Sequence, residues 1–177
     1  MYRPRNGLAR AGYSRPMSDV RVLKASGEGH LHGAAEVWAR ATAARDGDPD
    51  VAPTEEARPI IQAVLDASPR AFVLVAVHPD ERVVGFAAVR PADTAAVAEV
   101  CYVGVHPDRW GEGVGRILMD AVPEHLKSAG FSRAALLVYA DNERAVTLYR
   151  RLGWRASGEP VPHPRNGRPE QRYVLDL

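Results

Sequence analysis

The residues most able to do chemistry are three alternating glycines, Gly111, Gly113 and Gly115, which lie shortly after an apolar segment ending at Val105. Glycine adopts backbone angles that other residues avoid, and it lets a ligand approach without meeting a Cβ atom. An amphipathic helix pattern follows the glycines, and the free N–H groups at the start of a helix bind phosphate well. The stretch therefore predicts a pyrophosphate site, with a glycine-rich turn without ligand as the alternative.

Two common phosphate motifs do not fit this stretch. A nucleoside triphosphate loop has Lys followed by Ser or Thr after its last glycine, whereas Arg116 and Ile117 follow Gly115 here. A dinucleotide-binding fold has G-x-G-x-x-G after its first strand, whereas this chain has G-x-G-x-G beyond its midpoint. The sequence therefore favours a different phosphate-bearing ligand.

A second stretch, residues 136–154, has a similar organisation. An apolar strand pattern leads to Asp141-Asn142, which is typical of a helix cap, and the following helix pattern ends at Gly153. Taken together, the two stretches resemble the GNAT family of acyl-CoA-dependent N-acyltransferases, over roughly residues 71–154. The family pattern Arg/Gln-x-x-Gly-x-Gly/Ala falls on residues 110–115, and the second stretch matches the family at Asn142, Ala145, Tyr149 and Gly153.

The resemblance implies acetyl-CoA as co-substrate, with its pyrophosphate in the glycine-rich loop. The loop departs from the pattern at Trp110, so Arg109 or Arg116 is expected to supply the positive charge instead. The residues expected to contact the coenzyme lie in the loop, in the strand before it and at the start of the second helix: Val103, Val105, Arg109, Trp110, Gly111, Glu112, Gly113, Val114, Gly115, Arg116, Asn142 and Ala145.

Acyl transfer to an amine needs an acid for the departing thiolate and a base for the amine. The resemblance implies that Tyr149 is the acid, and a phenol with a pKa near 10 is protonated at neutral pH; packing in the core is its alternative role. Glu99 is the candidate base, because burial in an apolar strand raises the pKa of a carboxyl group; a carboxylate facing solvent is the alternative. Cys101 is a weaker candidate for an acylated nucleophile.

These residues must be positioned by strands and helices that the apolar patterning predicts. Early helices are expected at residues 29–45 and 54–67, and strands at 20–23, 71–77, 82–90, 96–105, 132–140 and 171–177. Sequential antiparallel strands interrupted late by helices indicate the α+β class, also called mixed α/β. The resemblance implies a GNAT-like fold, with a largely antiparallel sheet of six to seven strands and about four helices. Residues 132–140 are apolar at both parities, so both faces of that strand are expected to be buried.

Length and composition restrict the remaining possibilities. With 177 residues, 46% of them hydrophobic, the chain fits one domain, predicted at residues 19–177 after a disordered basic extension at 1–18. Met17 is an alternative translation start. The net charge of +1 suggests neither nucleic-acid nor membrane binding. A lone cysteine and the lack of a secretory pattern favour the cytoplasm. The histidines show no metal-ligand spacing, so no metal is expected.

The predicted function is N-acetyl transfer from acetyl-CoA to a primary amine of a small molecule, by direct attack. Acetylation of a protein N-terminus or lysine is one alternative, and a non-catalytic acyl-CoA-binding or regulatory domain is another. The resemblance implies that loops around residues 45–51 and 162–167 surround the acceptor. A homodimer is compatible with the family, although no stretch of the sequence requires it.

Overall fold

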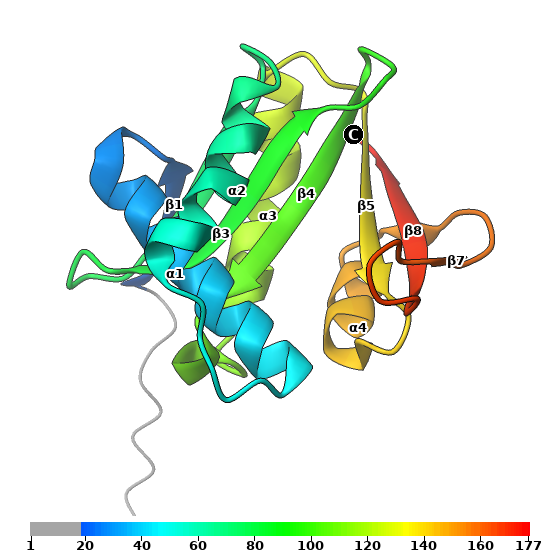
Figure 1. Cartoon of the computed structure of the whole chain (residues 1–177). Coiled ribbons are helices and arrows are strands. Elements are labelled where there is room, and N and C mark those ends of the chain that lie inside the picture. Colours follow the sequence, from blue (N-terminus) through cyan, green and yellow to red (C-terminus); the bar gives the residue numbers. More distant parts are fainter. Residues whose placement is uncertain (1–18) are drawn as a thin grey trace, which may run out of the picture.

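The computed structural model describes residues 19–177, so the basic extension predicted for residues 1–18 lies outside the described residues. Its middle layer is one sheet of eight strands (Figure 1). Along the sheet the strands are β1 (Arg21–Lys24), β2 (Phe72–Val77), β3 (Val83–Pro91), β4 (Val97–Val105), β5 (Arg133–Tyr139), β8 (Pro169–Asp176) and β6 (Arg155–Ala156), and β7 (Val161–Pro162) also pairs with β8.

Four α-helices accompany the sheet within residues 19–177. They are α1 (Gly27–Asp46), α2 (Thr54–Asp66), α3 (Val114–Ser128) and α4 (Glu143–Arg151). Helices α1 and α2 pack together on one face, and α3 packs on the other. The predicted α+β class and the largely antiparallel sheet are confirmed, because β4 and β5 form the one parallel pair among the described strands. The strand number exceeds the expected six to seven because β6 and β7 have two residues each and leave no periodic signal.

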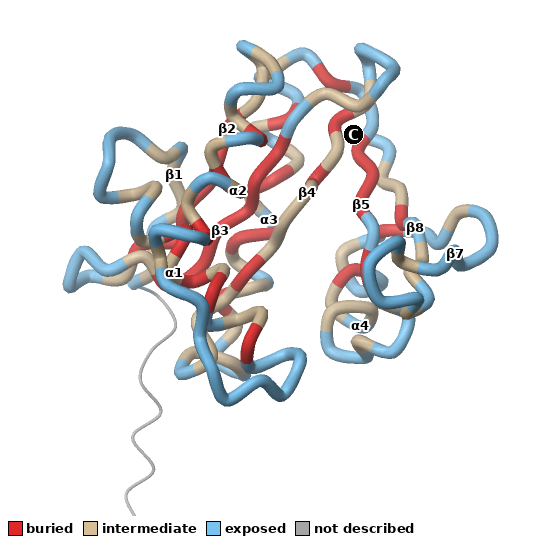
Figure 2. The backbone as a smooth tube through the Cα atoms, viewed as in Figure 1, coloured by how far each residue is buried: buried red, intermediate tan, exposed pale blue. Residues whose placement is uncertain are grey.

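The central strands are apolar on both faces because helices cover both faces. Every residue of β2 is buried, with Leu74 and Ala76 in the cluster beneath α3, and Val73 and Val75 in the cluster beneath α1 and α2. Period-two alternation then disappears from the sequence, as it does in sheets that are covered on both sides. Figure 2 shows these buried stretches along the middle of the sheet.

The two strands that follow β3 in the sheet separate along their length. β4 and β5 pair in parallel over three positions, the last of which joins Glu99 to Ala135. Beyond this point β4 continues against β3, and β5 continues against β8, so the two strands diverge (Figure 1). A register shift between Ala88 and Val89 leaves Cys101 as an extra residue of β4, which is a β-bulge close to the point of divergence.

The expectation that both faces of β5 are buried is wrong at Leu137. This residue is 47% exposed, whereas Leu136 is 2% exposed. Helices α1 and α2 pack on β2, β3 and β4, and they leave this face of β5 uncovered. Figure 2 shows exposed positions within β5 accordingly. An apolar side chain is therefore left open on the face opposite to α3.

Candidate active site

The glycine-rich loop forms the start of α3 at the end of β4. Strand β4 ends at Val105, a short 3₁₀ turn spans Pro107–Arg109, and α3 begins at Val114. Gly111 and Gly113 have φ angles of 86° and 84°, in the left-handed region that favours glycine. The start of α3 has no side-chain cap and no acidic residue in its first turn. Its free N–H groups and the positive end of the helix dipole therefore suit an anion.

The backbone at this helix start is open on one side and packed on the other. A Cβ atom added to Gly111 would meet no heavy atom within 4 Å, so the backbone is open to a ligand there. On the inner side, a Cβ at Gly85 of β3 would lie 3.2 Å from Val114 Cγ1, so a glycine at Gly85 allows α3 to start close to the sheet. The start of α3 thus packs against the sheet on the Gly85 side, and the loop is open to a ligand at Gly111.

The main chain of β4 presents polar groups on the side away from β3. The amide of His106 donates to the carbonyl of Val84 at 2.9 Å, which makes this a hydrogen-bonded pair of the antiparallel ladder. Because such pairs alternate along a ladder, Gly104 also bonds toward β3, while the N–H and C=O groups of Val103 and Val105 point away. They face the side from which β5 has diverged. A ligand lying along β4 could bond to the Val103 groups and the Val105 amide as an added strand would, while the Val105 carbonyl accepts a bond from within the chain.

The expected arginines of the loop are already paired with acidic side chains. Arg109 donates to Glu112 Oε2 at 3.1 Å, and Arg116 lies 3.5 Å from Asp120. Trp110 donates its Nε1–H to the Val105 carbonyl at 2.8 Å.

An arginine from another element reaches the same loop. The guanidinium of Arg144, on α4, stacks over the Trp110 ring at 4.5 Å. Sequence reasoning missed Arg144, because only the packing of α4 beside the loop brings it there.

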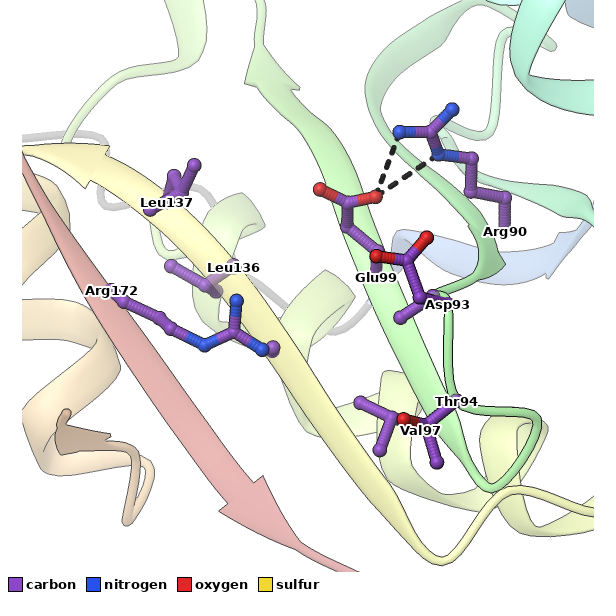
Figure 3. A pocket seen from close by; sticks show the side chains of 10 residues that line it. Arg90, Asp93, Thr94, Val97, Glu99, Leu136, Leu137 and Arg172 are labelled. Atoms are coloured by element: carbon purple, nitrogen blue, oxygen red, sulfur yellow. Dashed lines mark hydrogen bonds and ion pairs between the residues drawn. The ribbon is translucent and has the colours of Figure 1, made fainter. Parts of the chain in front are cut away.

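A pocket of about 340 Å³ adjoins the point where β4 and β5 diverge (Figure 3). Glu99 and Ala135, which form the last β4–β5 pair, both line it. Its lining includes both charged and apolar side chains. The lining residues are Arg90, Ala92, Asp93, Thr94, Val97, Glu99, Ala135, Leu136, Leu137 and Arg172. The sequence reasoning missed this grouping, because its members come from β3, β4, the loop between them, β5 and β8.

Glu99 lies in this pocket and is half-buried, between the two alternatives considered for it. Its side chain is 35% exposed, and Arg90 on the neighbouring strand donates to it from Nε and Nη2 at 3.0 and 2.9 Å. Both bonds end on Oε2, so Oε1 takes no part in the ion pair (Figure 3). That oxygen remains the group of Glu99 that could accept a proton from an acceptor.

Tyr149 packs beside Trp154 and Tyr173, with ring centroids 6.0 and 6.4 Å away, and is 6% exposed. Burial raises the pKa of its phenol above the usual value near 10. Within residues 19–177, Trp154 Nε1 is the one side-chain polar atom that is fully enclosed and has no hydrogen-bond partner. The hydroxyl of Tyr149 also has no partner, but it is not enclosed to that degree. Tyr149 is therefore a core residue whose phenol carries its proton at neutral pH.

Cys101 is poorly suited to act as a nucleophile. Burial, with the nearby charge of Glu99, raises the pKa of its thiol to about 11. Its thiol lies 3.6 Å from the Glu99 carbonyl oxygen, to which it donates. Because the thiolate is the reactive form, the thiol is largely unreactive at neutral pH.

The sequence model of the acetyltransferase (GNAT) family matches residues 34–154, which is more than half of the chain. The chain belongs to the GNAT family.

Similar structures and sequences agree with this assignment. A candidate acetyltransferase from Acinetobacter baylyi superimposes with a TM-score of 0.73 at 18% identity, covering 89% of this chain and 93% of that one. One from Salmonella typhimurium, solved with its cofactor acetyl-CoA, gives a TM-score of 0.67 at 18% identity, covering 90% and 94%. These likenesses show the GNAT fold.

A curated relative from Kocuria rhizophila is named mycothiol acetyltransferase. It is 42% identical over 91 residues, which cover 49% of this chain and 30% of that protein. The chain thus spans less than a third of that relative's length.

The second GNAT stretch places Asn142 as the cap of α4. Its Oδ1 accepts a hydrogen bond from the Ala145 amide at 3.3 Å, which confirms the predicted cap. This bond uses the side-chain carbonyl oxygen of Asn142. The side-chain NH₂ group of Asn142 takes no part in it. Contact between these residues and a coenzyme stays a prediction, as do the catalytic roles of Tyr149 and Glu99.

The two loops expected around the acceptor of this GNAT protein meet through Arg168. Its guanidinium donates to Asp46 at 3.0 Å and to Asp141 at 2.8 Å, and it stacks 4.0 Å above the Tyr139 ring. Arg45 lies over the same ring at 5.0 Å. The end of α1 is therefore joined to the end of β5 across the opening between the two diverging strands. Sequence reasoning did not identify Arg168 as the residue that links the loops.

Within residues 19–177, no helix is long and apolar enough to cross a membrane. In the same part, no group of three or more histidine, cysteine or acidic residues is arranged to hold a metal ion. The absence of a metal stays a prediction.

Proposed function

We propose that this GNAT protein transfers an acetyl group from acetyl-CoA to a primary amine of a small-molecule acceptor. The observation that carries the proposal is the uncapped, glycine-rich start of α3 at the end of β4, next to main-chain groups of Val103 and Val105 that point away from β3. A diphosphate at the helix start and an extended chain along β4 would use both features. The pocket at the last β4–β5 pair then offers space for an acceptor.

The proposed reaction is a direct attack. The lone pair of the amine forms a bond with the thioester carbonyl carbon, and the bond from this carbon to sulfur breaks. The amine nitrogen loses a proton to Glu99 Oε1, directly or through water, and the departing sulfur receives one from Tyr149. The main-chain N–H group of Val103 or Val105 stabilises the negative charge that develops on the thioester carbonyl oxygen.

The protonation of Tyr149 supports its role as acid. An acid must carry its proton at the working pH, and desolvation raises the pKa of this phenol. A hydroxyl without another hydrogen-bond partner is also free to donate to sulfur. Cys101, by contrast, has a thiol pKa of about 11, which favours direct attack over an acylated enzyme.

The test combines binding with turnover. Calorimetry should detect coenzyme A binding, and acetyl-CoA should release thiol in the presence of small primary amines. Thiol release with peptides and not with small amines would replace the proposal by protein acetylation. Binding without thiol release for any amine would indicate a non-catalytic domain, and no binding would exclude both enzymatic proposals.

A further inference from the structure

The charges of the pocket indicate which acceptor it takes. We propose that the acceptor carries a negatively charged group near its amine, as an amino acid does, and that Arg172 binds this group. The inference rests on the proposed function, because it names the acceptor of the same site.

Arg172 is the cation of this pocket that has no carboxylate partner. Arg90, on the other side, is held by Glu99. Nearby on the sheet, Arg133 and Arg155 share Asp176 at 2.7 and 2.5 Å. Within residues 19–177, the guanidinium of Arg172 makes no ion pair or side-chain hydrogen bond. A guanidinium matches a carboxylate with two parallel bonds, so an anionic ligand is the partner that its chemistry favours.

The fold keeps Arg172 beside open apolar surface. Arg172 of β8 pairs with Leu137 of β5, so the two side chains lie on the same face of the sheet. No helix covers that face here, and Leu137 is 47% exposed. Leu137 and Val97 add apolar surface to a lining that is otherwise mostly polar. A ligand with an apolar portion as well as charges would fit this arrangement.

The opposite side of the pocket suits the amine. Figure 3 shows Arg172 extending from β8 over β5, while the carboxylates of Glu99 and Asp93 lie on the β4 side. Glu99 belongs to the last β4–β5 pair and is the base that the proposed reaction assigns to the amine. An anion held by Arg172 would therefore orient the ligand with its amine toward Glu99. Arg172 would be a residue that determines acceptor specificity.

The experiment compares acceptors that differ in one charge. Leucine, methionine and phenylalanine are each paired with their amide and with the amine that lacks the carboxyl group. Thiol release gives kcat/KM for each acceptor. The value is expressed per concentration of unprotonated amine, because the amino group of an amino-acid amide loses its proton at lower pH than that of the amino acid. Loss of a charge-assisted bond is expected to lower kcat/KM at least about tenfold for the amide and for the plain amine.

Variants then assign the preference to one side chain. Arg172→Gln should lower kcat/KM for the amino acids about tenfold and leave their amides within about twofold, while Arg172→Lys should lie between. Arg151→Gln, an exposed arginine on α4 outside the pocket, is the matched control and should change neither.

Two outcomes would overturn the inference while leaving the proposed function intact. One is equal use of acids, amides and plain amines by the unaltered protein. The other is an equal loss for acids and amides in Arg172→Gln. Failure to release thiol with any amine would instead reject the proposed function, and this inference with it.

Discussion

The two ends of the candidate site are built in different ways. At the α3 end, consecutive residues from Val105 to Arg116 supply the site, mostly through their main chain. At the pocket end, side chains from β3, β4, β5 and β8 come together. At the first end the arginines are paired with nearby acidic side chains and the first helical turn has no acidic residue, whereas the second end contains Arg172, which has no such partner. The difference suggests that the α3 end recognises a constant ligand and the pocket end a variable one.

If this division holds, changes at the α3 end should alter coenzyme affinity, and changes at the pocket end should alter turnover. Four substitutions test it.

The largest effect is expected for Tyr149→Phe. Phenylalanine keeps the packing against Trp154 and Tyr173 but removes the proton donor, and general acids typically contribute at least about 100-fold. Steady-state thiol release should show kcat lowered about 100-fold, with the Kd for coenzyme A within about twofold. Tyr173→Phe, in the same cluster, is the control and should keep kcat. Unchanged turnover in Tyr149→Phe would remove this residue from the mechanism.

A smaller loss is expected for Glu99→Gln. The amide cannot take a proton from the acceptor, so kcat/KM for amines should fall by tens of fold, with coenzyme affinity unchanged. Glu36→Gln on α1 is the control, because it also removes an exposed ion pair with an arginine, Arg40. Equal activities in both variants would show that Glu99 is a structural partner of Arg90.

Gly113→Val should act on the other end. A β-branched residue at a φ of 84° is strained by about 1–3 kcal/mol, which would distort the start of α3. Calorimetry should therefore show coenzyme A bound about tenfold more weakly. Gly158→Val is the matched control, since Gly158 has a φ of 72° with no atom near its added Cβ. The same loss of affinity in both variants would contradict a specific role for the loop.

The smallest effect is expected for Cys101→Ser. With a thiol pKa of about 11, about a thousandth of the thiol is ionised at pH 8, so the thiol group is not needed for attack. Turnover should stay within about twofold of the unaltered protein. Alkylation of Cys101 by iodoacetamide, followed by mass spectrometry, should be slow at pH 7 and accelerate as the pH rises toward 11. Loss of turnover in Cys101→Ser would support an acylated cysteine.

Local patterns were predicted well wherever one segment contains its own signal. The strand before the glycines, the start of α3 and the Asn142 cap depend on neighbouring residues, so reading the chain in order was sufficient. The sequence left the exposure of Glu99 open between two alternatives, because this exposure depends on how far α1 and α2 extend over the sheet. The same cause explains the error at Leu137.

The sequence by itself determined the fold class, the family and the glycine-rich loop, because each of these depends on residue types at short, fixed spacing. The tertiary structure alone decided that Arg144 stacks on Trp110, that Arg168 joins two distant loops, and that Arg172 faces Glu99 across a pocket. These residues lie on separate elements, and only the pairing of the strands and the extent of the helices bring them together. Single charged residues have no periodicity, so the sequence contains no signal for their meeting.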